Sequence, residues 1–319
     1  MTMTMKQLFN RDGDGEREIV SAVGLISNCV SFDKWEPLLP LGVREVEAIV
    51  GPEPVEALSR YYLEHGDLAG DGDAMADALR FLRQAVAMFT WLRVIPTLDA
   101  QHDGNGRSRR LGENERGLSA LQEFKDEQNI LRMAYEAVDA LIEVMDRGAF
   151  TFWTGSRRWR QREGLLVRSK EEFDEFYRIG SHRLFVTLLP VMREVQSAEI
   201  APVLGRHLGA ILDGSASAPV SALADRARRA LVLLTMKKAV ERLPVEVIPE
   251  GVVQVQQSQP VKSRLRAEQS ARTAVAASLG DDARRILEAL QAEVAAIEGG
   301  AAADDYVTGP IVHSKGLSF

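Results

Sequence analysis

An internal duplication constrains what this chain can fold into more than any other feature of its sequence. Residues 44–51 read REVEAIVG and residues 198–205 read AEIAPVLG, so each phrase places a Glu before a branched apolar residue and closes on Gly. Upstream of the two phrases, WEPLLP at 35–40 parallels FVTLLP at 185–190. Downstream, each phrase is followed by a short helical run, a long amphipathic stretch, a Gly-centred turn and a final helical stretch, in that order. This shared order favours duplication of one helical module over a chance likeness between amphipathic helices.

Apolar spacing predicts a long helix in each copy. In the first copy, apolar residues recur at intervals of three and four, which places them on one face of an α-helix: Met75, Leu79, Leu82, Val86 and Phe89. The second copy shows the same kind of face: Leu223, Ala227, Leu231 and Leu234. Because proline cannot continue a helix, Pro96 and Pro244 predict that both helices stop near the same place.

Each copy is predicted to continue with a small β-hairpin and a terminal helix. The hairpin segments are TLDAQHDGNGRSR at 97–109 and VEVIPEGVVQVQQ at 245–257, and each has a Gly-centred turn of the kind that favours tight hairpins. Residues at helical spacing, nearly all of them apolar, then predict the two terminal helices: Leu118, Leu121, Phe124, Gln128, Leu131, Tyr135, Val138, Ile142 and Met145 in the first copy, and Ile286, Leu290, Val294 and Ile297 in the second. The glycines that follow, Gly148 and Gly299, are the expected C-terminal caps.

The sequence therefore predicts a mainly α fold. It comprises two tandem copies of a helical module, each with a small β-hairpin, and an extended C-terminal tail. The expected boundaries are 1–147 for the first module, 148–170 for an aromatic and basic linker, 171–298 for the second module and 299–319 for the tail.

Composition and charge exclude several classes of protein. The chain has 319 residues and a net charge of −7, which argues against a protein that coats nucleic acid through a generally basic surface. Its one cysteine, Cys29, excludes an intrachain disulfide and a site built from several thiolates. No run of about 18 apolar residues occurs, so we expect no membrane-spanning helix.

Two acidic, Gly-rich loops resemble calcium loops but fail the spacing, which requires Gly at the sixth position and Glu at the twelfth. Counted from Asp99, the sixth position is Gly104 but the twelfth is Arg110. Counted from Asp12, the sixth position is already Arg17. The histidines are scattered, and the sequence contains neither a phosphate-binding loop nor a nucleophile elbow. We therefore expect a protein that is not an enzyme and that binds no metal or cofactor.

The segment between the two copies carries the most pointed cluster of candidate functional side chains. It reads FWTGSRRWRQR, and its candidate interface residues are Trp153, Arg157, Arg158, Trp159, Arg160 and Arg162. Arginines contact phosphates and tryptophans stack on bases, but both residue types are also enriched at protein interfaces. Three interpretations stay open: a nucleic-acid contact, a protein–protein interface, and a structural linker whose tryptophans pack on the helices while its arginines pair with an acidic surface.

The last stretch, GGAAADDYVTGPIVHSKGLSF, is rich in Gly and Ala, then mildly apolar, and has no helical period. We expect it to act as an arm that docks on another subunit or partner, for example by adding a strand to an exposed edge. The candidate contact residues are Tyr306, Ile311, Val312, Leu317 and Phe319.

A scattered pattern of stretches makes the chain resemble a known family. The stretches include LFN, FDKWEPLLP, EVEAIVG, EAVDALIEVM, FWTGSRRW, LLVRSKEEFDEFYRIGSHRLFVTLLPVMREVQSAEIAPVLG and RLPVEVIPEGVVQ, spread over residues 6–298. They resemble an uncharacterised, duplicated helical family of phages and prophages of the Bacteroidetes group. The duplicated helical modules of that family resemble phage head–tail connector (adaptor) proteins, which is a likeness of fold.

The resemblance implies a non-enzymatic virion structural protein and supplies no catalytic residues. The expected location is the virion neck, after synthesis in the bacterial cytoplasm. The expected partners are further copies of the chain in a ring, together with portal and tail proteins, and no membrane. DNA would pass through an acidic lumen without specific binding. The alternative is a helical protein that binds nucleic acid through residues 152–162, FWTGSRRWRQR, which we call the Arg/Trp segment.

Overall fold

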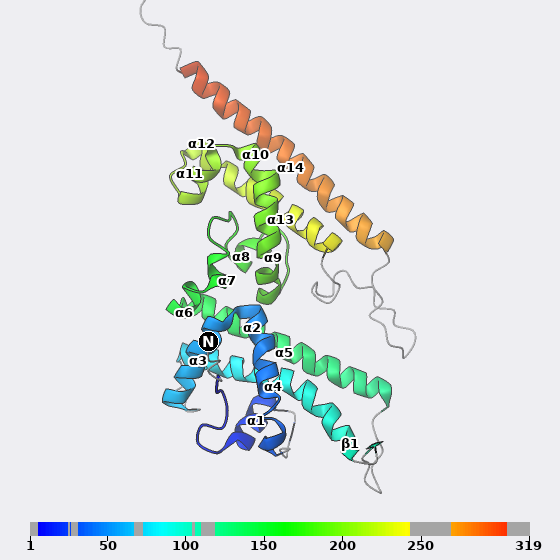
Figure 1. Cartoon of the computed structure of the whole chain (residues 1–319). Helices are drawn as coiled ribbons and strands as arrows, with labels where there is room; N and C mark the ends of the chain where they lie inside the picture. Colours follow the sequence, from blue (N-terminus) through cyan, green and yellow to red (C-terminus); the bar gives the residue numbers. More distant parts are fainter. Residues whose placement is uncertain are drawn as a thin grey trace, which may run out of the picture. The chain divides into compact units, whose positions relative to one another are not determined.

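A computed structural model describes residues 6–24, 26, 31–66, 73–103, 106–109, 119–242 and 269–304, and it is mainly helical (Figure 1). The chain divides into two compact units. Unit 1 takes in the described residues up to Glu163 together with Ile179–Leu189. Unit 2 takes in Gly164–Arg178 and all described residues from Pro190 onward. Among the described residues, no helix is both long enough and apolar enough to cross a membrane.

Unit 1 is built on two long helices that lie side by side, α4 and α5. Its elements in chain order are α1 (Gly15–Val23), η1 (Phe32–Lys34), α2 (Leu39–Val50), α3 (Pro52–His65), α4 (Ala74–Asp99), β1 (Ala100–Asp103), β2 (Gly106–Arg109), α5 (Ala120–Gly148), α6 (Thr151–Thr154) and α7 (Arg157–Arg160). The helices α1, α2 and α3 all pack on α4. The start of α5 is fixed by a capping box, in which the side chains of Ser119 and Gln122 each bond the other residue's backbone N–H.

Unit 2 is likewise built on two long helices, α13 and α14, which pack along each other. Its elements are α8 (Lys170–Asp174), the second part of α9 (His182–Val195), the π-helix η2 (Gln196–Ile200), α10 (Ala201–Leu204), α11 (His207–Asp213), α12 (Ala218–Ser221), α13 (Leu223–Arg242) and α14 (Gln269–Asp304). The first part of α9 belongs to unit 1.

Residues 44–51 and 198–205, the twin phrases, both end a helix on a glycine. Each forms the end of a helix, α2 in unit 1 and α10 in unit 2, and each closes on a glycine with a positive φ: 91° at Gly51 and 51° at Gly205. Buried branched residues sit one turn apart ahead of the glycine, Val46 and Val50 in the first phrase and Ile200 and Leu204 in the second. The likeness of the two phrases therefore extends to the positive φ of the closing glycine and to burial, whereas residues 198–200 of the second phrase belong to the π-helix η2.

The helices α4 and α13 share a second local pattern. In both, a fully buried threonine donates its hydroxyl to the carbonyl one turn earlier: Thr90 to Val86 O and Thr235 to Leu231 O, each at 2.7 Å. An arginine precedes each threonine by the same interval. These arginines, Arg83 and Arg228, both contact a buried non-helical apolar segment that opens their unit. The Arg83 guanidinium lies 4.8 Å from the Phe9 ring centroid, and Arg228 Nε donates to Leu166 O at 3.1 Å. These shared contacts fit a duplicated module.

The structure corrects two expected helix ends. Helix α4 runs through Pro96 to Asp99, because proline removes a single backbone donor and the turns before it are already bonded. Helix α14 runs past Gly299 to Asp304, so that glycine does not cap it. Gly148 is the last residue of α5, and the left-handed residue after it is Ala149, with a φ of 44°.

Strands are confined to one short pair within the described residues. Strands β1 and β2 are antiparallel, with Ala100 opposite Arg109 and Asp103 opposite Gly106. The second segment expected to form a hairpin, 245–257, lies outside the described residues. A hairpin in each module therefore stays a prediction.

The predicted linker, residues 148–170, is divided between the two units. Its part up to Glu163 forms α6, α7 and the turns around them in unit 1, and the rest belongs to unit 2. Cys29 and the predicted tail beyond Asp304 lie outside the described residues.

Candidate functional site

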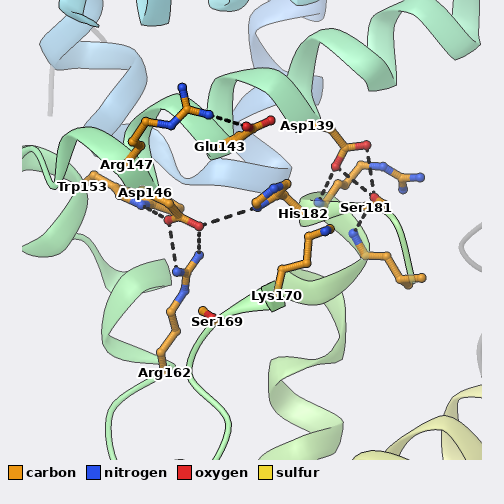
Figure 2. A network of polar contacts seen from close by, with 12 residues as sticks. Asp139, Glu143, Asp146, Arg147, Trp153, Arg162, Ser169, Lys170, Ser181 and His182 are labelled. Carbon is orange, nitrogen blue, oxygen red and sulfur yellow. Dashed lines mark hydrogen bonds and ion pairs between the residues drawn. The ribbon is translucent and has the colours of Figure 1, made fainter. Parts of the chain in front are cut away.

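A polar network around Asp146, near the end of α5, brings together part of the Arg/Trp segment (Figure 2). Trp153 Nε1 donates to Asp146 Oδ1 at 2.6 Å. The guanidinium of Arg162 spans the same carboxylate, with Nη1 3.0 Å from Oδ1 and Nη2 3.2 Å from Oδ2. His182 Nδ1 lies 3.7 Å from Oδ2, which is within ion-pairing distance but longer than a normal hydrogen bond.

Local structure places these partners. The chain leaves α5 through the left-handed Ala149, and the one-turn helix α6 then sets Trp153 fully inside unit 1. Ser156 caps the following helix α7 by accepting from Trp159 N at 3.1 Å. The turn after α7 then brings Arg162 back to Asp146. The segment is thus a compact pair of turns that folds onto α5.

Aromatic rings surround the arginine of this network. The Arg162 guanidinium carbon is 4.6 Å from the Trp159 ring centroid, 5.4 Å from that of Phe185 and 5.5 Å from that of Trp153. Trp153 and Trp159 meet edge to face with centroids 6.1 Å apart. Arg162 is only 4% exposed. A cation held between ring faces and paired with a carboxylate is well compensated for its loss of water.

The charges in the network balance. Burial alone would raise the pKa of Asp146, but His182, the charge of Arg162, and hydrogen bonds from Trp153 and Arg162 together hold it below its ordinary value. Asp146 is therefore ionised at neutral pH, and its negative charge compensates Arg162.

A second carboxylate of α5 holds the start of α9. Asp139 accepts from Ser181 Oγ at 2.9 Å and from Arg183 N at 2.6 Å. Ser181 in turn accepts from Leu184 N at 3.1 Å, so it caps the helix. Arg183 also lies over the Tyr135 ring, 4.0 Å from its centroid. Figure 2 shows Asp139 and Asp146 on the same side of α5, where they anchor two different segments.

A further buried network in unit 1 joins α1, α3 and α4. Tyr62 Oη donates to Glu18 at 2.8 Å, and Arg83 Nη2 lies 3.3 Å from the same carboxylate. Asn10 N donates to Glu18 Oε2 at 2.6 Å. Burial, and then the hydrogen bond to Glu18 and its negative charge, raise the pKa of Tyr62 above its ordinary value against the opposing effect of Arg11. The phenol thus stays protonated and serves as a donor.

Neither network was predicted from the sequence. The available signal was a carboxylate on an apolar helix face: Asp146 follows Ile142 by one helical turn, and Ile142 belongs to the apolar stripe of α5. Nothing in the sequence indicated the partners of Asp146, because Arg162 and His182 lie in other segments, further along the chain. Among the described residues, no three His, Cys, Asp or Glu side chains gather in a way that could hold a metal ion.

The six candidates of the Arg/Trp segment separate into three groups. Trp153 and Arg162 are buried in the network, and Trp159 is half-buried beside them. Arg158 is half-buried and donates from Nη2 to Ala48 O at 2.5 Å. Arg157 and Arg160 are exposed.

The structure therefore does not present these residues as one surface. The tail candidates, Tyr306, Ile311, Val312, Leu317 and Phe319, lie outside the described residues.

Comparison with known proteins gives one match. A family model described as a family of unknown function (DUF6712) matches residues 58–162 and 207–295, together more than half of the chain. The first region lies in unit 1 and the described part of the second lies in unit 2. Searches of curated proteins and of solved structures returned no match.

Proposed function

The chain belongs to the DUF6712 family, and on that premise we propose that it is a non-enzymatic structural protein of a phage virion. In this proposal it is a head–tail connector, or adaptor, in the neck of the particle. Copies assemble as a ring that bridges portal and tail proteins, and DNA passes through the lumen without specific binding. Synthesis takes place in the bacterial cytoplasm.

The observation that carries the proposal is the repetition of one helical module. The family model matches in two separate regions of the chain, and the two units share the positive-φ glycine that closes each twin phrase and the Arg–Thr pattern of α4 and α13. A chain with two similar modules has two similar surfaces to offer to neighbours. Such a chain suits a bridging role, in which contacts repeat around a ring and close by rotation.

The chemistry of the buried networks supports a structural role over a catalytic one. Asp146 is paired with Arg162 and lies within ion-pairing distance of His182, and aromatic rings surround the Arg162 guanidinium. Glu18 is likewise committed to Tyr62, Arg83 and Asn10. In a catalytic site, at least one polar group is expected to be directed at a substrate position rather than at its neighbours.

Particles assembled from the genome that encodes this chain provide the test. Purified particles are treated with a lysine-reactive cross-linker and analysed by mass spectrometry. We expect the chain in the particle, with cross-links to itself and to portal and tail proteins. If the chain is missing from purified particles, or cross-links to none of these proteins, the proposed role is wrong.

The alternative is nucleic-acid binding through the Arg/Trp segment. The burial of Trp153 and Arg162 removes two of its six candidates, but Arg157 and Arg160 stay exposed. Salt-dependent DNA binding that disappears in the Arg157→Ala/Arg160→Ala double variant would favour this alternative. The matched control is Arg60→Ala/Arg80→Ala, which removes two exposed arginines from other helices of unit 1.

A further inference from the structure

The chain passes back and forth between unit 1 and unit 2 at places that contain a glycine or a proline. Within the described residues there are three crossings: after Glu163, after Arg178 and after Leu189. The first leads directly into Gly164 and the second into Gly180 by way of Ile179, while the third falls at Pro190 inside helix α9. We call these three places the unit joints.

Two of the joints contain glycines in a conformation that other residues rarely adopt. Gly164 has a φ of 72° and Gly180 a φ of 65°, and a Cβ built on either one would meet no other atom within 4 Å. Close packing therefore does not account for the absence of a side chain at these two positions. The backbone conformation accounts for the glycines instead, because glycine is the residue that takes positive φ without strain.

The third joint weakens a helix in its middle. Pro190 has no N–H to donate to the carbonyl of Val186, and its ring crowds that carbonyl, so α9 lacks one hydrogen bond at the crossing. Just before it, Thr187 Oγ1 donates to Arg183 O at 3.0 Å, a contact that bends helices. Just after α9, the backbone changes to the π-helix η2. Helix α9 is therefore irregular on both sides of the joint.

Strong anchors flank the joints on either side. Before the first joint, Arg162 is fixed to Asp146 in unit 1. After it, Gly164 O accepts from Gln196 Nε2 at 2.6 Å in unit 2, and Leu166 N donates to Gln196 Oε1 at 2.8 Å. Only the exposed Glu163 separates the two anchored residues.

Helix α9 is bound to unit 1 at its start and, through more exposed ion pairs, to unit 2 past Pro190. Its first turn is bound to Asp139 of unit 1 through Ser181 and Arg183. Past Pro190, Glu194 pairs with Lys238 Nζ at 3.0 Å and with Arg242 Nη1 at 2.6 Å, both on α13 of unit 2.

From this placement we propose that the joints form a hinge about which the two units rotate while each keeps its own core. The polar network of Figure 2 fixes the unit 1 side of that hinge, and Gln196 fixes the unit 2 side. Hinges of this kind absorb backbone rotation at a few glycines or element ends while the flanking segments stay rigid. The inference does not depend on the role in a virion.

Distances between spin labels, measured by pulsed electron paramagnetic resonance, test the hinge. One label is placed by Arg147→Cys on α5 of unit 1 and the other by Arg284→Cys on α14 of unit 2, in a Cys29→Ser background; both arginines are exposed. The reference pair lies within unit 1, at Arg147→Cys and Arg80→Cys. We expect the distance distribution between units to be at least about twice as broad as the one within unit 1.

The variant Pro190→Ala restores the missing backbone donor of α9. It should narrow the distribution between units toward the width found within unit 1 and leave the latter unchanged. The matched control is Pro52→Ala, which replaces an exposed proline at the start of α3, directly after the non-helical Gly51, where no backbone donor is needed, and should change neither width. Equal widths between and within units in the wild-type protein, or no narrowing in Pro190→Ala, would overturn the proposal. The wild-type comparison stands even where the variant fails to fold.

Discussion

At the residue scale, one carboxylate fixes two segments of unit 1. Asp146 receives hydrogen bonds from Trp153 and Arg162 and lies in ion-pairing distance of His182. A buried arginine beside a neutral partner would keep its charge, because a guanidinium is not deprotonated in proteins. The stability of this region therefore depends on the negative charge of Asp146.

Replacing that carboxylate with an amide tests the dependence. We expect Asp146→Asn to lower the free energy of unfolding by about 3–5 kcal/mol, the usual cost of breaking a buried pair from one side. Urea unfolding followed by circular dichroism measures the change. Glu143→Gln serves as the control. Glu143 is an exposed residue of the same helix that pairs with Arg147 one turn further on, and loss of its charge should cost no more than about 1 kcal/mol. An Asp146→Asn variant as stable as Glu143→Gln would contradict the assigned role.

The same carboxylate should make stability depend on pH in acid. The pKa of Asp146 is lower in the folded state than its ordinary value of about 3.9. Its contribution is therefore complete above that ordinary value and is lost as pH falls through the lower, folded-state pKa. The stability difference between wild type and Asp146→Asn should shrink as the pH falls below about 4. A stability difference that grows below a pH of about 4 would contradict the lowered pKa of Asp146 in the folded state.

At the element scale, the contact between α2 and α4 is unusually close. A Cβ on Gly42 of α2 would clash with Thr90 Oγ1 and lie 2.6 Å from Val86 O on α4. Thr90 is fully buried, and its hydroxyl is already bonded to Val86 O. The two helices approach this closely because one of them has no side chain at the crossing.

Adding one methyl group at that crossing should therefore destabilise unit 1. We expect Gly42→Ala to lower the free energy of unfolding by about 1–3 kcal/mol, as overpacking of a tight core does. Gly209→Ala is the matched control: Gly209 lies in helix α11 with nothing within 4 Å of a built Cβ, so alanine there should be neutral or stabilise by up to about 1 kcal/mol. Thermal unfolding of both variants decides the point, and equal effects at the two glycines would refute the close packing.

The long helices could be predicted because their signal is local. The apolar stripes of α4 and α13 recur at helical spacing, and four of the five residues in the first stripe, and all four in the second, are buried. The stripe of α5 was less reliable: Val138, Ile142 and Met145 are buried, whereas Phe124 is 39% exposed. Whether a stripe residue is covered depends on which neighbour packs there, and the spacing within one helix does not contain that information.

The candidate site could not be predicted in the same way. The Arg/Trp segment was recognised as a cluster, but the separation of its members into buried and exposed residues follows from contacts with Asp146 and Ala48, which lie outside it. Three interpretations of the segment were left open by the sequence. The burial of Trp153 and Arg162 is what the structural-linker interpretation expects of these two residues. Arg157 and Arg160 stay exposed, and their partner stays a prediction.

At the scale of the whole molecule, two modules of one design and a hinge between them suit a chain that meets two neighbours at once. The tail extends this idea, since its apolar residues are predicted to dock on another subunit or partner. A chain truncated before Tyr306 should keep its helical content but lose assembly or partner binding, measured by sedimentation and by pull-down. The matched control replaces Arg284 and Arg285, both exposed on α14, with Ala and should assemble normally. If truncation leaves assembly and partner binding unchanged, the predicted role of the tail is wrong.

The central claim is that this chain is a bridging, ring-forming structural protein. The mass of the purified protein in solution, measured by light scattering and followed by negative-stain imaging, tests it most directly. We predict a closed ring, or a monomer that forms a ring when a portal-like partner is added. A strict monomer or dimer that stays so with every partner recovered from particles would contradict the claim.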